Sequence, residues 1–257
     1  IDWQRTRNGV KDLQVRDIGY ENGVLGGVIS AISAFASPGD SILLHSPTYM
    51  GFTRCITENG FHIIHSPLKQ DENGVMRMDY EDMDDKLRRY HIHVAVFCSP
   101  HNPCGRVWER EEIEKAMAVY RKNQCIVIAD ESWSDLTLNG HKHTPTQSVS
   151  EDAKNRTIAF YAPSKTFNLA GLQASNIFIP NDILRRRFKA ELTALSIGSL
   201  NTMGMIACEA AYLGGSEWLY ELRSYLRGNI DFVREFINNK IKGIKLVEPE
   251  GLYLLWL

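Results

Sequence analysis

The run HVAVFC at residues 93–98, followed by SPHNP at residues 99–103, carries the strongest structural signal in the chain. The run is almost continuously apolar, which is typical of a strand buried on both faces of a sheet. Similar short runs, separated by segments with a helical pattern, occur at residues 41–45, 62–65, 126–129, 157–161 and 176–179. This alternation predicts an α/β fold with a doubly wound, mainly parallel sheet.

The segments between these runs carry helix signals. We expect helices at residues 28–36, 79–90, 109–123 and 183–195. Asp79 and Asp182 are the predicted N-terminal caps of the second and fourth of these helices. The third has acidic residues at its start and basic residues at its end, as the helix dipole favours.

The pattern changes after Gly198. Residues 202–213 and 217–239 read as helices, and residues 244–247 and 252–257 read as strands. We therefore predict a large domain at residues 1–213. Residues 214–257 would form a long connecting helix and the start of a smaller α+β domain. The chain has no initiator Met and stops within an apolar run, so we expect a piece of a longer protein.

The composition is that of an ordinary globular protein, with 44% hydrophobic residues and a net charge of −2. With no long basic run, neither nucleic acid nor a membrane surface is expected as a partner. No apolar stretch is long enough to span a bilayer. The five cysteines are scattered and form no CxxC pair, which favours a reducing, cytoplasmic location.

Chemically distinctive residues follow the predicted strands. Tyr49 comes after residues 41–45, Asn102 after 93–98, Asp130 after 126–129 and Lys165 after 157–161. In open α/β sheets, ligands bind at the carboxyl ends of the strands, so these side chains should meet at one edge. Together with a glycine-rich helix start at residues 23–27, they could hold an anionic, planar ring that carries an aldehyde.

Each of these residues also has an ordinary structural explanation. Tyr49 could be an aromatic at the edge of the core, Asn102 a turn residue, Asp130 a helix cap and Lys165 a surface lysine. Their order on successive strand ends favours a shared site. The two imidazoles in GHKH at residues 140–143 have no cysteine or carboxylate cluster beside them in sequence, so we expect no metal site.

Several longer motifs carry a family resemblance. They are SPHNPCGRVW (99–108), DE (130–131), SDL (134–136), GHKH (140–143) and PSKTFNLAGL (163–172). With these motifs the chain resembles the class I/II aminotransferase superfamily of fold-type I pyridoxal 5′-phosphate (PLP) enzymes. Within it, the chain is most similar to the MalY/PatB-type cystathionine β-lyases, also called C–S lyases. The resemblance covers essentially the whole chain.

The resemblance implies roles around the ring of the cofactor. Lys165 would hold PLP as a Schiff base and, once displaced by the substrate amine, move the Cα proton. Asp130 would pair with the pyridine nitrogen, so that the ring can act as an electron sink. Asn102 would bond the 3′-oxygen, and Tyr49 would stack on the ring.

The resemblance also implies a phosphate site. The backbone N–H groups of Val24 and Leu25, after Gly23, would bind the phosphate together with the hydroxyl of Ser164.

The chain also departs from the family pattern. Trp133, which we also expect to contact the cofactor, stands where the lyases usually have His, and Ala162 stands where a phosphate-binding Ser is usual. Glu21 and Asn22 precede Gly23 in place of Thr-Pro, and Gln173 replaces an Arg that many aminotransferases have. We expect PLP to bind, but more loosely than in a relative with the usual Ser and His.

By resemblance, the reaction expected is C–S β-cleavage of an amino acid such as cystathionine or cysteine, giving thiol, pyruvate and ammonia. An aminotransferase is the first alternative, because it would use the same residues. A PLP-binding regulatory protein with weak activity is the second. The resemblance also implies a homodimer.

Overall fold

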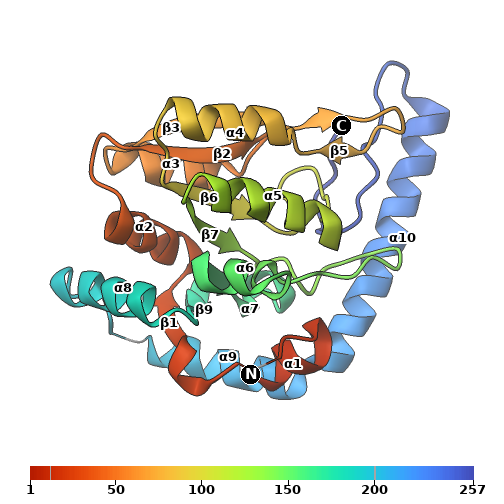
Figure 1. Ribbon diagram of the computed structural model, residues 1–257. Helices are drawn as coiled ribbons and strands as arrows, with labels where there is room; N and C mark the ends of the chain where they lie inside the picture. Colours follow the sequence, from red (N-terminus) through yellow and green to blue (C-terminus); the bar gives the residue numbers. More distant parts are fainter. Residues whose placement is uncertain (12, 200) are drawn as a thin grey trace.

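A seven-stranded sheet forms the centre of the molecule (Figure 1). The structure is a computed structural model that describes residues 1–11, 13–199 and 201–257. In chain order the strands of this sheet are β1 (Ile18–Asn22), β2 (Ser41–Ser46), β3 (His62–Pro67), β6 (Val94–Cys98), β7 (Ile126–Asp130), β8 (Thr157–Tyr161) and β9 (Ala174–Phe178). Across the sheet their order is β1-β9-β8-β7-β6-β2-β3.

The sheet is mainly parallel, as the apolar runs predict. Strands β8, β7, β6, β2 and β3 run parallel to one another. Strand β9 is antiparallel to both β8 and β1. The register pairs Cys98 with Asp130, so the loops that follow β6 and β7 begin side by side. A short hairpin, β4 (Lys69–Gln70) with β5 (Met76–Arg77), lies outside this sheet.

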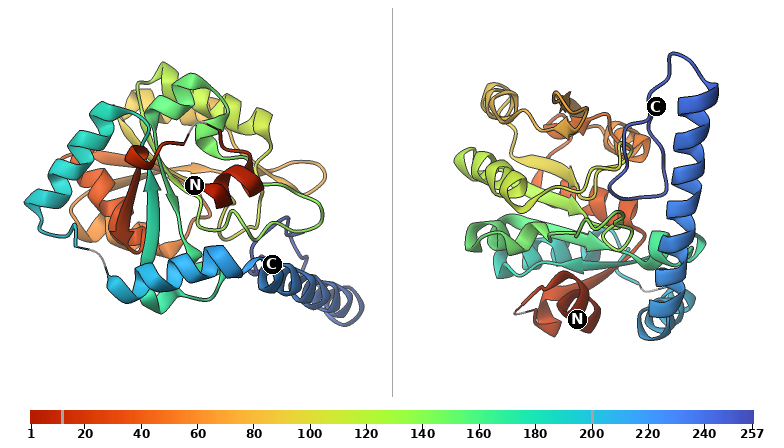
Figure 2. Two further views of the ribbon diagram at one scale, coloured as in Figure 1. Left: turned by 90° about the horizontal axis from the view of Figure 1, so that it is seen from below. Right: turned by 90° about the vertical axis from the view of Figure 1, so that its right-hand side faces the viewer.

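Helices cover both faces of the sheet (Figures 1 and 2). One face packs against α2 (Val24–Phe35), α3 (Met50–Glu58) and α8 (Asp182–Ala194), and the other against α4 (Tyr80–Arg89), α5 (Arg110–Lys122) and α6 (Glu151–Arg156). Successive residues of a strand point to opposite faces of the sheet. Leu44 packs in the core beneath α2, α3 and α8, and Leu43 packs in the core beneath α4, α5 and α6.

The remaining helices lie around the rim of this body. They are α1 (Asp2–Asn8), α7 (Pro163–Thr166), α9 (Thr202–Gly214), α10 (Ser216–Lys240) and the 3₁₀ turns η1 (Val15–Asp17), η2 (Thr146–Ser148) and η3 (Ala170–Leu172). Figure 2 shows α10 running along one side of the molecule. None of the helices in the described part of the chain has the length and apolar character needed to cross a membrane.

Several details differ from the sequence predictions. Helix α2 begins at Val24, four residues before the predicted start. Asn181 rather than Asp182 caps α8, because its side chain accepts from the N–H groups of Ile183 and Leu184. Strand β1 has no apolar run and was not predicted.

The two predicted C-terminal strands are wrong. Residues 244–247 and 252–257 contribute only the single bridge between Val247 and Trp256, and Gly251 bridges to Thr137. Leu252 has a φ of 69°, a left-handed conformation that interrupts an extended strand. The division at residue 213 stays a prediction, although α9 and α10 do meet at Gly215.

Candidate active site

A cavity of about 330 Å³ opens at the carboxyl ends of β2, β6, β7 and β8. All nine residues proposed from the sequence line it, namely Gly23, Val24, Leu25, Tyr49, Asn102, Asp130, Trp133, Ser164 and Lys165. Asn22, Gly26, Ser132, Ala170 and Gln173 complete the lining. Its volume is at the lower end of the range for small-molecule sites. The structure therefore brings the predicted residues into one place, while their roles remain to be tested.

The start of α2 forms one wall of the cavity. Gly23 has a φ of 84°, which favours glycine, and turns the chain from β1 into the helix. The first N–H groups of a helix lack intrahelical partners, so those of Val24 and Leu25 can bind an anion. Glu21, just before this turn, is buried, and burial raises the pKa of its carboxyl.

Asp130, the last residue of β7, lines the cavity. Its side chain is buried, and Oδ1 accepts a hydrogen bond of 3.0 Å from the N–H of Ser132. Burial raises the pKa of Asp130 above its usual range, and the charge of Lys165 partly opposes this shift. A buried carboxylate gains most from a cationic partner, so this position suits a protonated ring nitrogen.

Asn102 and Tyr49 lie on adjacent loops that are tied together. His101 Nε2 lies 2.7 Å from the carbonyl oxygen of Pro47, which joins the loop after β6 to the loop after β2. Asn102 is largely buried, whereas the Tyr49 side chain is 37% exposed and packs edge-on against Phe52. An aromatic ring exposed at a cavity offers its face to a planar ligand.

Lys165 stands on α7, directly after β8. The next residue anchors this short helix, because Thr166 Oγ1 donates to Asp135 Oδ2 at 3.0 Å. Trp3 Nε1 donates to the other oxygen of the same carboxylate at 2.9 Å. These contacts fix the backbone of α7 and leave the lysine side chain at the cavity.

Trp133 and Ala162, the two departures from the family pattern, take different positions. Trp133 lines the cavity, and its ring centroid lies 5.5 Å from Lys165 Nζ. The ring of Tyr253, from the C-terminal segment, packs 4.7 Å from that of Trp133. Ala162 is buried at the N-cap of α7, just outside the residues that line the cavity.

A buried cluster behind Asp130 was missed by the sequence analysis. The carboxylate of Glu131 accepts hydrogen bonds from His143 Nε2 at 2.7 Å, from the N–H of Thr146 at 2.8 Å and from the Tyr161 hydroxyl. The motifs DE and GHKH contain Glu131 and His143, but twelve residues separate the two and nothing in the sequence pairs them. Among the described residues, no group of three or more His, Cys, Asp or Glu could hold a metal ion.

A lysine, a buried carboxylate and a helix N-terminus around one cavity of a seven-stranded sheet define the architecture of a fold-type I PLP enzyme. The chain belongs to the aminotransferase class I and II family, whose model matches residues 2–257. This family is PLP-dependent.

Individual relatives agree with this assignment. Cystathionine beta-lyase PatB of Bacillus subtilis is 38% identical over 255 residues, which are 99% of this chain and 65% of that protein. A PLP-bound putative aminotransferase from Clostridium difficile matches with a TM-score of 0.95 and 35% identity, over 100% of this chain and 65% of that one. The PLP-bound C–S lyase of Staphylococcus hominis matches with a TM-score of 0.93 and 28% identity, over 100% and 64%. The chain thus spans slightly less than two thirds of the length of these relatives.

Proposed function

We propose that this chain is the cofactor-binding part of a PLP-dependent C–S β-lyase. The observation that carries the proposal is the single cavity that joins Lys165, Asp130, Asn102 and Tyr49 to the start of α2. The similarity to PatB, named a cystathionine beta-lyase, favours the lyase reaction over others of the family.

The residues present fit PLP. The free N–H groups of Val24 and Leu25 suit the phosphate, and Ser164 adds a hydroxyl at the same cavity. The buried carboxylate of Asp130 suits a protonated pyridine nitrogen, and the Lys165 amine suits the aldehyde carbon. When bound, PLP supplies an electron sink for the pair released at the substrate Cα.

The side chains of this chain then act around the reacting carbon. Lys165 Nζ takes the Cα proton as a general base. Asp130 keeps the pyridine nitrogen protonated, and Asn102 donates to the 3′-oxygen. Sulfur leaves Cβ as a thiolate with the C–S electron pair and takes a proton to become a thiol. The remaining enamine hydrolyses to pyruvate and ammonia.

An aminotransferase is the second candidate, because it would use the same cavity. The match to a putative aminotransferase of C. difficile supports it. The two reactions differ in the fate of the electrons released at Cα. In a lyase they would expel sulfur, whereas an aminotransferase would transfer the substrate amino group and would therefore need a 2-oxo acid acceptor for turnover. A third possibility, a PLP-binding regulatory protein with weak activity, rests on Trp133 and Ala162 alone.

The test is to incubate the full-length, PLP-loaded protein with cystathionine in the absence of any 2-oxo acid. We expect thiol and pyruvate to appear in equal amounts, and a Lys165→Ala variant to produce neither. Turnover that requires a 2-oxo acid would replace the lyase assignment with aminotransfer. The absence of both reactions would favour the regulatory protein. We further propose that the full-length protein is a homodimer, which sedimentation of the PLP-loaded protein would test, and that it lies in the cytoplasm, which fractionation of cells would test.

A further inference from the structure

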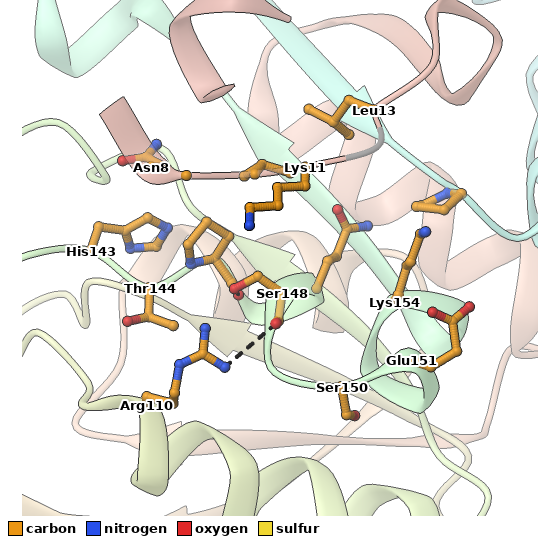
Figure 3. Close-up of a pocket in the computed structure, with 15 residues that line it drawn as sticks. Asn8, Lys11, Leu13, Arg110, His143, Thr144, Ser148, Ser150, Glu151 and Lys154 are labelled. Atoms are coloured by element: carbon orange, nitrogen blue, oxygen red, sulfur yellow. Dashed lines mark hydrogen bonds between the residues drawn. The ribbon is translucent and has the colours of Figure 1, made fainter. Parts of the chain in front are cut away.

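A second cavity, of about 560 Å³, lies apart from the candidate active site and shares none of its lining residues. It is formed by the segment that joins α1 to η1, the start of α5, and the stretch from His143 through α6 (Figure 3). The function proposed above leaves this cavity without a role.

Cationic side chains from three separate segments converge on this cavity. Lys11 comes from the α1–η1 segment, Arg110 from the first residue of α5, and Lys154 from α6. Figure 3 shows the Lys11 amine and the Arg110 guanidinium extending into the same space from opposite sides. Glu151 is the one acidic residue among the described lining residues, so the lining carries an excess of two positive charges.

These cations make few and long polar contacts with the other described residues. The side chains of Lys11 and Lys154 make no hydrogen bond or ion pair with other described residues, and the contacts of Arg110 with Glu114 and with the Ser148 carbonyl are both long, at 3.5 Å. Like charges brought together repel one another, and the single acidic residue of the lining, Glu151, offsets only one of the three cations, so an anion in the cavity would relieve the remaining repulsion.

A buried imidazole supplies a second, independent observation. His143 lines the cavity, its side chain is 1% exposed, and its Nε2 contacts Glu131. Its Nδ1 has no hydrogen-bond partner among the described residues. A buried polar atom without a partner is unfavourable. Because Nε2 donates to Glu131, Nδ1 is the acceptor of the neutral ring, and the O–H of a ligand such as a monohydrogen phosphate would supply its partner. Thr144 and Ser148 line the same cavity, and the Ser148 hydroxyl donates to the carbonyl of Pro145.

We propose that this cavity is a binding site for a small dianion that carries phosphate or carboxylate groups. The charge of a dianion matches the excess of two positive charges. The guanidinium of Arg110 suits the planar, paired oxygens of such groups, and the two ammonium groups act as point charges beside it. Through His143, the site also contacts Glu131, the neighbour of Asp130. The inference does not depend on the proposed lyase activity, because binding can be measured directly.

Calorimetric titration of the full-length, PLP-loaded protein tests the proposal, with inorganic phosphate and succinate as two separate probes. Loading with PLP keeps the start of α2 filled, so that phosphate cannot bind there. We expect saturable binding of at least one probe. Phosphate binding alone would identify a phosphorylated ligand, and succinate binding alone a dicarboxylate.

Matched variants locate the site. Lys154→Gln and Arg110→Gln should each weaken the binding about tenfold, the loss expected for one charge-assisted hydrogen bond. Lys115→Gln and Arg121→Gln remove the same charges from exposed positions on α5 outside the cavity, and should leave the affinity unchanged. If a cavity variant fails to fold, Lys11→Gln replaces it. Lack of saturable binding, or equal weakening by the cavity and control variants, would overturn the proposal.

Discussion

The substitution Ala162→Ser distinguishes two roles of a hydroxyl at the start of α7, namely capping the helix and binding the cofactor phosphate. Ala162 occupies the N-cap of this helix with extended backbone, φ −144° and ψ 144°, and provides no side-chain cap. A serine there could accept a hydrogen bond from the free N–H of Ser164 or Lys165. Its hydroxyl also reaches one atom further than the alanine methyl, toward the cavity that Ser164 lines.

The two roles differ in their free energy, and one changes the stability of the fold whereas the other changes the affinity for PLP. A cap alone stabilises the fold by about 1 kcal/mol and leaves the cofactor affinity as it is, because the cap is present with and without PLP. A hydrogen bond to the phosphate is worth about 1.5–3 kcal/mol, since one partner is charged. That gain corresponds to roughly ten- to a hundredfold in the dissociation constant of PLP. Because Ala162 is only 3% exposed, water competes little for the new hydroxyl.

Titration of the full-length protein with PLP, followed by absorbance, distinguishes the two outcomes. We expect Ala162→Ser to bind PLP at least about tenfold more tightly than the wild type. Ala118→Ser adds the same hydroxyl at an exposed position on α5 and should change nothing. Equal or weaker affinity in the Ala162→Ser variant would refute the reasoning. In that case another group, such as a residue of a partner subunit, already fills the role, because the Tyr161 hydroxyl is engaged with Glu131.

Three further predictions follow from buried groups. Asp130→Ala should keep PLP bound through Lys165 but slow exchange of the substrate Cα proton for deuterium by about a hundredfold or more, and exchange at the wild-type rate would exclude its role. Burial lowers the pKa of His45 to about 3, so the unfolded chain binds a proton that the folded protein does not, and stability falls as the pH drops from 6.5 toward 3. His45→Gln should remove up to about 1.4 kcal/mol per pH unit of that slope in denaturant titrations, and an unchanged slope would assign it to other groups. In Gly27→Ala the new Cβ would lie 2.2 Å from the Phe160 ring, so we expect the free energy of unfolding to fall by about 1–3 kcal/mol. Gly26→Ala is the control, because its Cβ would lie 3.8 Å from the nearest atom and should cost no stability. Equal stability of the two variants would contradict the prediction.

The central sheet could be predicted from the sequence because its strands are short, continuous apolar runs. The predicted run at residues 157–161 coincides with β8, and the run at 41–45 differs from β2 by one residue. The site followed from the same reasoning, since parallel strands bring their carboxyl ends to one edge. Tyr49, Asn102, Asp130 and Lys165 are far apart in sequence and yet line one cavity.

What the sequence could not predict depends on contacts between distant segments. Strand β1, with the sequence IGYEN, has no apolar run and is a strand because it pairs with β9. Residues 252–257 are apolar enough for a strand, but Leu252 instead donates its N–H to the carbonyl of Leu136. Asn181 and Asp182 are both good caps, and only the structure shows which one is used. The contact between His143 and Glu131 likewise required coordinates.

The most direct test of the account is to locate the lysine that holds the cofactor. The full-length protein would be saturated with PLP, reduced with borohydride, digested and mapped by mass spectrometry. The account predicts visible absorbance before reduction and a single modified peptide, with the label on Lys165. A label on another lysine, or a protein that stays colourless at saturating PLP, would contradict it.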